Sequence, residues 1–280
     1  MTPSHRTRTS GPAAGARRGP ARDLLAELGL ATRRDGDDLR GTASVTAAMH
    51  VPGAGRLRTS VLAAWADTLT GLLATQATAP RVPVTLELDV QLYGPAPASG
   101  TVDATARVVK AGRSVFVASV GFTTAGGEPL AMAHASFMTA PDPGITLPPA
   151  FDIELPRLRK RLSRPLAERA GCERREPGRA VLPRSDDGLN ISGTINGGLI
   201  ALVAEEAALS LAPGDALCSL GLRYLQPART GPVVATARMR DGLAQVELRD
   251  SGNGDRLTGI ATARTFGTAG ASGGGRAGDR

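Results

Sequence analysis

The chain has 280 residues, of which 41% are hydrophobic and 21% are charged, so a polypeptide that is disordered throughout is excluded. The net charge of +7 is concentrated in residues 1–20 and 154–176, which contribute +4 each, and aromatic residues make up only 3%. Because the remaining parts are close to neutral and offer few rings on which bases could stack, we do not expect a nucleic-acid partner.

No apolar run approaches the roughly 20 residues of a membrane-spanning helix, and no apolar segment follows the basic N-terminus as it would in a secretory signal. We therefore expect a cytoplasmic protein that does not bind membranes. Two cysteines, Cys172 and Cys218, are too few for a disulfide framework or a four-ligand zinc site. With only three histidines as well, neither a metal site nor a Ser-His-Asp triad is expected.

The predicted elements follow one plan twice along the chain. A short helix and a strand lead into a long apolar helix, at Leu57–Leu73 in the first half and Ile195–Leu211 in the second, and three or four strands follow each helix. The predicted organisation is a disordered basic tail (1–20), an N-terminal domain (21–140), a linker with a basic helix (141–176), a C-terminal domain (177–267) and a disordered glycine-rich tail (268–280).

An internal repeat supports this plan. The string Ala104-Thr105-Ala106-Arg107 recurs as Ala235-Thr236-Ala237-Arg238, and at the same offset Tyr93 matches Tyr224 and Gly100 matches Gly231. Upstream, Leu25-Ala26-Glu27 matches Leu166-Ala167-Glu168. We interpret the chain as a duplication.

The patterning of each half predicts an α+β domain in which an antiparallel sheet wraps around a central helix. The helix after Gly197 is apolar on nearly all sides, as expected of a buried element. Residues 243–249 alternate between apolar and polar side chains, which is typical of a strand with one face in the core.

The segment from Asn190 to Glu205 resembles the signature of hotdog-fold acyl-CoA thioesterases of the phenylacetate-pathway (PaaI-like) type. In that family an asparagine precedes a His-Gly-Gly at the start of the central helix, and an acidic residue lies about two turns further on. Here Asn190, the pair Gly197-Gly198 and Glu205 match, while Asn196 replaces the histidine. The resemblance implies two fused hotdog domains and hydrolysis of an acyl-CoA, with no cofactor beyond the coenzyme A of the substrate.

The first half resembles the same helix with an acidic residue, Asp67, in the corresponding place, but with Thr59 and Ser60 where the glycines would stand and Pro52 where the asparagine would stand. In resembling enzymes the helices of two hotdogs pack together and the carboxylate comes from the partner. Asp67 is thus expected to face Asn190 and the Gly197 N–H, which would polarise the thioester carbonyl, and to act as nucleophile or general base.

In the reciprocal place, Glu205 would face Thr59 and Pro52, and we expect that site to be degraded. The candidate catalytic residues are Asp67, Asn190, Gly197 and Glu205, and the candidate substrate-binding residues are Thr59, Ser60, Asn196 and Gly198. The resemblance also allows a homodimer of the whole chain.

Several alternatives stay open at this stage. Asn196 is equally typical of a helix N-cap, the glycine pair of close helix packing, and Glu205 of a solvated helix residue. The basic run from Arg157 to Arg164 suits a solvated linker helix, or less readily a site for the phosphates of coenzyme A. A non-catalytic acyl-CoA-binding protein and an acyl-thioester hydratase or dehydratase remain as alternative functions.

Overall fold

The computed structural model describes residues 23–147 and 152–267, so the two tails expected at 1–20 and 268–280 lie outside the described residues. Its main feature is a twelve-stranded antiparallel sheet in the order β1-β2-β6-β7-β8-β5-β11-β14-β13-β12-β10-β9. The strands of the first half are β1 (Ala31–Asp35), β2 (Asp38–Val45), β5 (Pro83–Leu92), β6 (Gly100–Ala111), β7 (Phe116–Thr124) and β8 (Pro129–Thr139). Those of the second half are β9 (Glu173–Glu176), β10 (Arg179–Leu182), β11 (Leu217–Tyr224), β12 (Val233–Arg240), β13 (Leu243–Asp250) and β14 (Arg256–Thr265).

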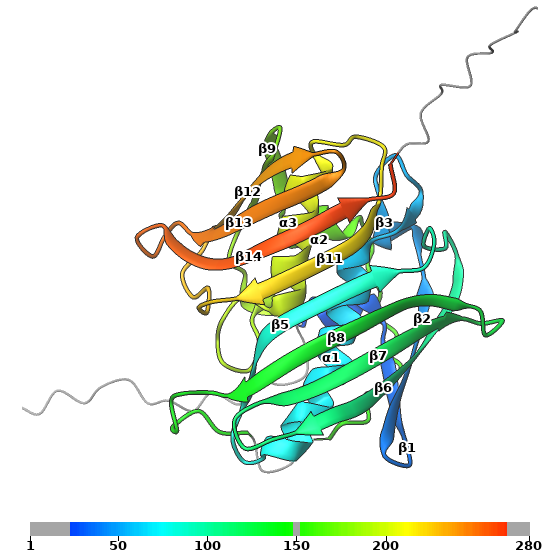
Figure 1. Cartoon of the computed structure of the whole chain (residues 1–280), viewed down its shortest axis with the longest axis vertical. Coiled ribbons are helices and arrows are strands. Elements are labelled where there is room, and N and C mark those ends of the chain that lie inside the picture. Colours follow the sequence, from blue (N-terminus) through cyan, green and yellow to red (C-terminus); the bar gives the residue numbers. More distant parts are fainter. Residues whose placement is uncertain (1–22, 148–151, 268–280) are drawn as a thin grey trace, which may run out of the picture.

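Two long helices, α1 (Thr59–Thr78) and α3 (Gly197–Leu209), lie side by side against one face of this sheet, as Figure 1 shows. The shorter elements are the helix α2 (Leu166–Ala170), three 3₁₀ turns at Leu25–Leu28, Ala47–Met49 and Asp186–Gly188, and the small hairpin of β3 (His50–Val51) and β4 (Arg56–Leu57). None of the helices in the described part of the chain is long and apolar enough to cross a membrane.

The two halves of the sheet have equivalent strand orders. From edge to centre the first half runs β1-β2-β6-β7-β8-β5 and the second runs β9-β10-β12-β13-β14-β11, with α1 and α3 inserted at the same point of each sequence of elements. This arrangement confirms the α+β architecture of a helix against an antiparallel sheet, present twice.

The two half-sheets join directly, which the sequence analysis does not foresee. β5 and β11 pair antiparallel from Ser219 opposite Gln91 to Arg223 opposite Glu87. Each of these strands would otherwise be an edge with unpaired N–H and C=O groups, and the pairing satisfies both edges at once. The joint also holds the two helices against each other beneath it.

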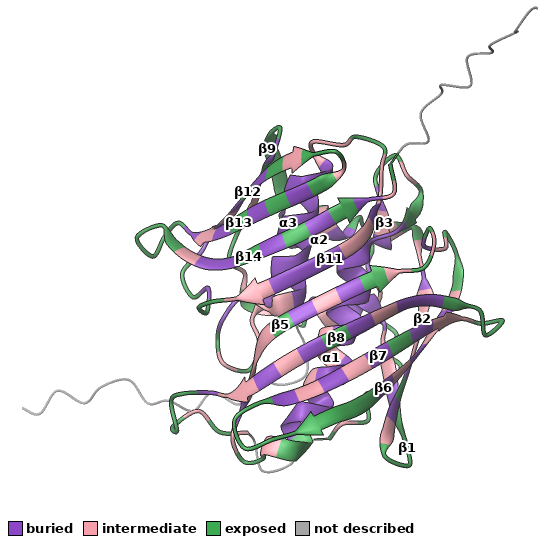
Figure 2. Cartoon of the chain, viewed as in Figure 1, coloured by how far each residue is buried: buried purple, intermediate pink, exposed green. Residues whose placement is uncertain are grey.

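The helices are buried because they are apolar on nearly all sides. Most residues of both are inaccessible to solvent, and in Figure 2 the two helices are largely coloured as buried. The helices pack tightly at Gly198, where an added Cβ would lie 2.7 Å from the Ala64 Cβ. A side chain at this position would therefore push the helices apart, so the glycine permits the close packing.

The region expected as a linker, 141–176, differs from its prediction. The basic run Arg157–Arg164 is not helical; it lies between Pro156 and Pro165, and among the described residues of the region, 141–147 and 152–176, the only helix is the short α2. Strand β9 also falls in this range, and it pairs with β10 at the edge of the sheet. In the structure the second half thus begins with α2, the counterpart of the 3₁₀ turn at Leu25–Leu28, rather than at residue 177.

Candidate active site

The side chain of Asp67, in the third turn of α1, lies against the first residue of α3. A Cβ added to Gly197 would be 2.8 Å from Asp67 Oδ2, well inside van der Waals contact. The carboxylate of one half and the helix N-terminus of the other therefore meet, and a side chain at position 197 would have to displace the Asp67 carboxylate.

Thr85, on β5, holds the Asp67 carboxylate in place. Its Oγ1 donates a hydrogen bond of 2.9 Å to Asp67 Oδ1. Burial raises the pKa of Asp67 from 3.8 to about 6, and the Thr85 hydrogen bond acts in the opposite direction. A carboxylate with this pKa is ionised at neutral pH but poorly solvated, which suits a group that accepts a proton or attacks a carbon.

The N–H of Gly197 is the natural donor for an oxyanion at this site. Gly197 is the first residue of α3, and its N–H has no acceptor within residues 23–147 and 152–267. Free N–H groups at a helix N-terminus carry partial positive charge and stabilise a developing negative charge.

Asn196 and Gly198 are engaged with each other. Asn196 is the N-cap of α3, and its Oδ1 accepts a hydrogen bond of 2.9 Å from the Gly198 N–H. This is the N-cap alternative of the sequence analysis, and it leaves the Gly197 N–H as the free donor of the first turn.

Asn190 lies in the loop that leads into α3. Its Oδ1 accepts hydrogen bonds from the backbone N–H groups of Ser192 and Thr194, at 3.0 and 3.2 Å, and so shapes its own loop. No contact between Asn190 and Asp67 is recorded within the described residues. The structure therefore brings Asp67 and Gly197 together, while the Asn190 side-chain oxygen is directed to backbone groups.

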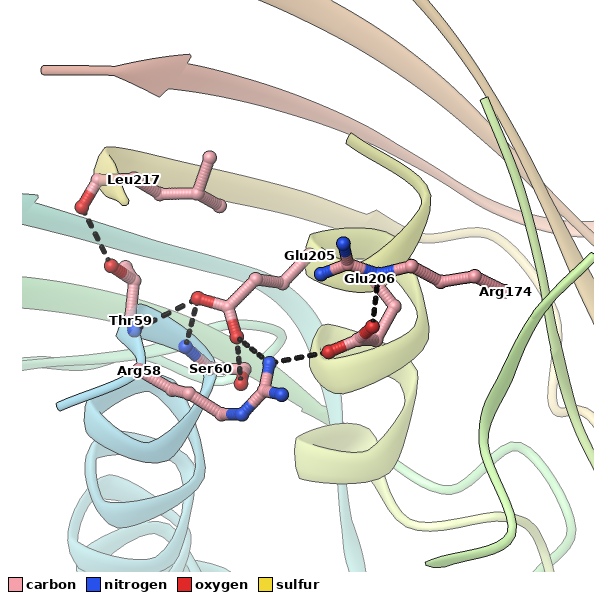
Figure 3. Close-up of polar contacts among 7 residues, drawn as sticks. All are labelled: Arg58, Thr59, Ser60, Arg174, Glu205, Glu206 and Leu217. Atoms are coloured by element: carbon pink, nitrogen blue, oxygen red, sulfur yellow. Dashed lines mark hydrogen bonds and ion pairs between the residues drawn. The ribbon is translucent and has the colours of Figure 1, made fainter. Parts of the chain in front are cut away.

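The reciprocal location, between α3 and the N-terminus of α1, is closed. Glu205 is fully buried, and its Oε1 accepts hydrogen bonds from the N–H groups of Thr59 at 2.9 Å and Ser60 at 3.3 Å. Its Oε2 accepts a hydrogen bond of 2.6 Å from Ser60 Oγ (Figure 3). The carboxylate itself thus occupies the donors that an oxyanion would require.

A buried arginine completes this cluster. Arg58 Nη1 lies 3.2 Å from Glu205 Oε2 and 2.5 Å from Glu206 Oε1, and Arg174 pairs with the other oxygen of Glu206, as drawn in Figure 3. Burial alone would lower the pKa of Arg58, but the two carboxylates raise it overall. Glu205, Glu206 and Arg58 therefore form an internal ion network whose members are held by one another, as expected of a structural role.

Sequence reasoning overlooks two residues of the Asp67 site. Thr85 carries no motif and reaches Asp67 only because β5 packs over α1. Tyr224, at the end of β11, donates a hydrogen bond of 3.1 Å from its hydroxyl to the Gly197 carbonyl. The repeat singles out Tyr224 as a match to Tyr93, which is a signal of equivalence but not of a role.

Comparison with known proteins supports the assignment of the fold. Residues 55–131, which include Asp67 and Thr85, match the family model described as the thioesterase superfamily. A search of curated proteins finds no match.

Three solved structures have a similar architecture, and in each the similarity to this chain covers nearly the whole of the solved chain. An acyl-ACP thioesterase from Bacteroides thetaiotaomicron is 14% identical, with a TM-score of 0.56 over 81% of this chain and 97% of that one. A 12:0-ACP thioesterase from Umbellularia californica is 12% identical, with a TM-score of 0.57 over 83% of this chain and 98% of that one. A TesB protein from Mycobacterium avium subsp. paratuberculosis is 17% identical, with a TM-score of 0.55 over 86% of this chain and 97% of that one.

At these identities the structures establish the fold, which is the double hotdog. The sequence match to the thioesterase superfamily is confined to residues 55–131, so the first half of this double hotdog carries the sequence pattern of that family. The match of residues 55–131 to this family supports thioester hydrolysis as the general chemistry. The choice between coenzyme A and acyl carrier protein as the thiol is a separate question, since both ACP thioesterases have the same fold.

Proposed function

We propose that the protein hydrolyses an acyl-CoA to the free acid and coenzyme A at a single site, formed by Asp67 of α1 and the N-terminus of α3. The observation that carries the proposal is the position of the Asp67 carboxylate, which lies against Gly197, the residue whose N–H is free within the described residues. Hydrolysis of a thioester needs a group that activates or carries out the attack on the carbonyl carbon and a donor that stabilises the oxyanion. The carboxylate and the unpaired N–H at the helix N-terminus can supply these two functions.

In the proposed reaction the carbonyl oxygen of the thioester accepts a hydrogen bond from the Gly197 N–H. Asp67 then acts in one of two ways: it accepts a proton from a water that attacks the carbonyl carbon, or it attacks that carbon itself and forms an anhydride that water cleaves. In both cases the carbon–sulfur bond breaks, the thiolate of coenzyme A leaves and takes up a proton, and one water is consumed.

The state of Asp67 fits either role. With a pKa of about 6, the side chain is mostly ionised at neutral pH, and the Thr85 hydrogen bond directs one oxygen to β5 while the other faces α3. Glu205 is the weaker candidate, because both of its oxygens already accept hydrogen bonds within a closed cluster. We therefore assign one active site to each chain.

Coenzyme A as the carrier is supported by the position of the basic run. Lys160 pairs with Glu27 at 2.5 Å, and Leu25, two residues before Glu27, lies 2.9 Å from a Cβ added to Gly198 at the start of α3. The basic run is thus tied to the segment that packs on the start of α3, and Arg157 and Arg159 of the same run are exposed. Their guanidinium groups suit the phosphates of coenzyme A.

The double variant Arg157→Glu/Arg159→Glu tests this part of the proposal. We expect KM for an acyl-CoA to rise by about tenfold with little change in kcat, because remote phosphate contacts contribute binding in the ground and transition states alike. Arg240→Glu/Arg264→Glu, two exposed arginines of the outer sheet face, is the matched control for charge. An unchanged KM, or equal turnover of acyl-ACP and acyl-CoA by the wild type, would contradict coenzyme A as the specific carrier.

The main test compares thiol release from a panel of acyl-CoAs by the wild type and three variants. Asp67→Asn and Asp67→Ala should lose at least about a hundredfold in kcat, while Glu205→Gln should keep its activity per folded molecule. Loss of activity in Glu205→Gln alone would overturn the assignment. Binding of acyl-CoA without thiol release by the wild type would favour a non-catalytic acyl-CoA-binding protein.

A further inference from the structure

Tyr224 reaches the proposed site from the end of β11. Its hydroxyl donates a 3.1 Å hydrogen bond to the Gly197 carbonyl, and it lies 3.2 Å from a Cβ added to Gly197. The same added Cβ would be 2.8 Å from Asp67 Oδ2. The phenol and the carboxylate therefore flank Gly197 on the same side.

The first turn of α3 needs such support because it begins with two glycines. Glycine has the largest backbone freedom of any residue and costs about 1 kcal/mol relative to alanine within a helix, so local preference does not hold these peptide groups in place. The Asn196 side chain fixes the Gly198 N–H, and Tyr224 fixes the Gly197 carbonyl. Both anchors act on one peptide group, the Gly197 carbonyl with the Gly198 N–H, and the Gly197 Cα joins this group directly to the peptide group whose N–H is free.

We propose that Tyr224 is a positioning residue for this site: by holding the Gly197 carbonyl it keeps the Gly197 N–H aimed at the thioester, next to Asp67. This proposal rests on the proposed function, which makes that N–H the oxyanion donor. A donor that shifts by a fraction of an ångström loses much of its stabilisation of the transition state, so the effect should be on turnover rather than on substrate binding.

The surroundings of Tyr224 keep it a donor over the working pH range. Burial raises the pKa of Tyr224 well above its usual value, and the negative charge of Asp67 raises it further. The hydroxyl therefore keeps its proton at neutral pH, where Asp67 is ionised.

The chain supplies a matched control, since it has only two tyrosines and the other, Tyr93, is 66% exposed at the equivalent place of the first half. We expect Tyr224→Phe to lower kcat by about tenfold with KM changed less than twofold, whereas Tyr93→Phe leaves both unchanged. A kcat of Tyr224→Phe within twofold of the wild type, at equal folded fraction, would overturn the proposal.

Two measurements separate this proposal from the proposed function. A ketone analogue, in which CH₂ replaces the thioester sulfur, keeps the carbonyl; an S-alkyl coenzyme A lacks it. Tyr224→Phe should weaken binding of the ketone several-fold and leave the S-alkyl compound unaffected, and equal effects on both would contradict the positioning role. These outcomes do not depend on hydrolysis.

The second measurement is an ultraviolet titration of Tyr224 in the Tyr93→Phe background, where it is the only tyrosine. Adding Asp67→Asn should lower the pKa of Tyr224, because a neighbouring negative charge is removed. An unchanged titration would show that Tyr224 and Asp67 are not neighbours and would refute the arrangement.

Discussion

Replacing Asp67 by asparagine should make the protein more stable at neutral pH while abolishing its activity. Folding raises the pKa of this carboxyl from 3.8 to about 6, so the folded state disfavours its ionised form. Each pKa unit corresponds to about 1.36 kcal/mol, so above pH 7 the ionised Asp67 costs about 3 kcal/mol of folding free energy. Asparagine has nearly the same shape and can accept the Thr85 hydrogen bond, but it carries no charge.

The dependence on pH identifies this mechanism. Because the folded state holds the proton more tightly than the unfolded state, the wild type loses stability as pH rises from about 4 to about 6. The difference in unfolding free energy, Asp67→Asn minus wild type, should thus grow by about 2 kcal/mol between about pH 4.5 and about pH 8. Urea unfolding at a series of pH values measures it, with Asp37→Asn, on the exposed turn between β1 and β2, as the control for removal of one negative charge. A difference that stays constant with pH would refute the reasoning.

Three further results are expected. Glu205→Gln should lower the unfolding free energy by about 3 kcal/mol in urea titrations, because the buried Arg58 loses a charged partner, and a loss below about 1 kcal/mol would mean that the network is not structural. Gly198→Ala should destabilise by about 1–3 kcal/mol through overpacking of the two helices, while Gly71→Ala, where the nearest atom is 3.9 Å from the added Cβ, should be neutral or stabilising by up to about 1 kcal/mol; equal effects would contradict the close contact. The rate of thiol release should fall as pH drops through about 6, since protonated Asp67 can act neither as base nor as nucleophile, and a profile that is flat down to about pH 4.5 would exclude Asp67.

The central helices could be predicted from sequence because an element buried on all sides has an unmistakable composition. The expected span Leu57–Leu73 became α1 at Thr59–Thr78, and Ile195–Leu211 became α3 at Gly197–Leu209. The repeat added that both halves carry their elements in the same order along the chain. Asp67 stood out as the one acidic residue in an apolar helix, where a carboxylate is costly unless it has a use.

Features that depend on tertiary pairing could not be predicted in this way. The joint between β5 and β11 depends on which edges meet in space, and neither strand carries a mark of it. Thr85 is an ordinary strand residue until the sheet closes over α1. Likewise, Glu205 has the residue type of a catalytic acid, and only its hydrogen bonds to Thr59 and Ser60 reveal it as part of a closed network.

The most direct test of the account is a crystal structure with the ketone analogue of an acyl-CoA. The account predicts that the ketone oxygen lies within hydrogen-bond distance of the Gly197 nitrogen, that the carbonyl carbon faces Asp67, and that one analogue binds per chain. An analogue whose carbonyl lies at Thr59 and Ser60, or away from both helix N-termini, would contradict it.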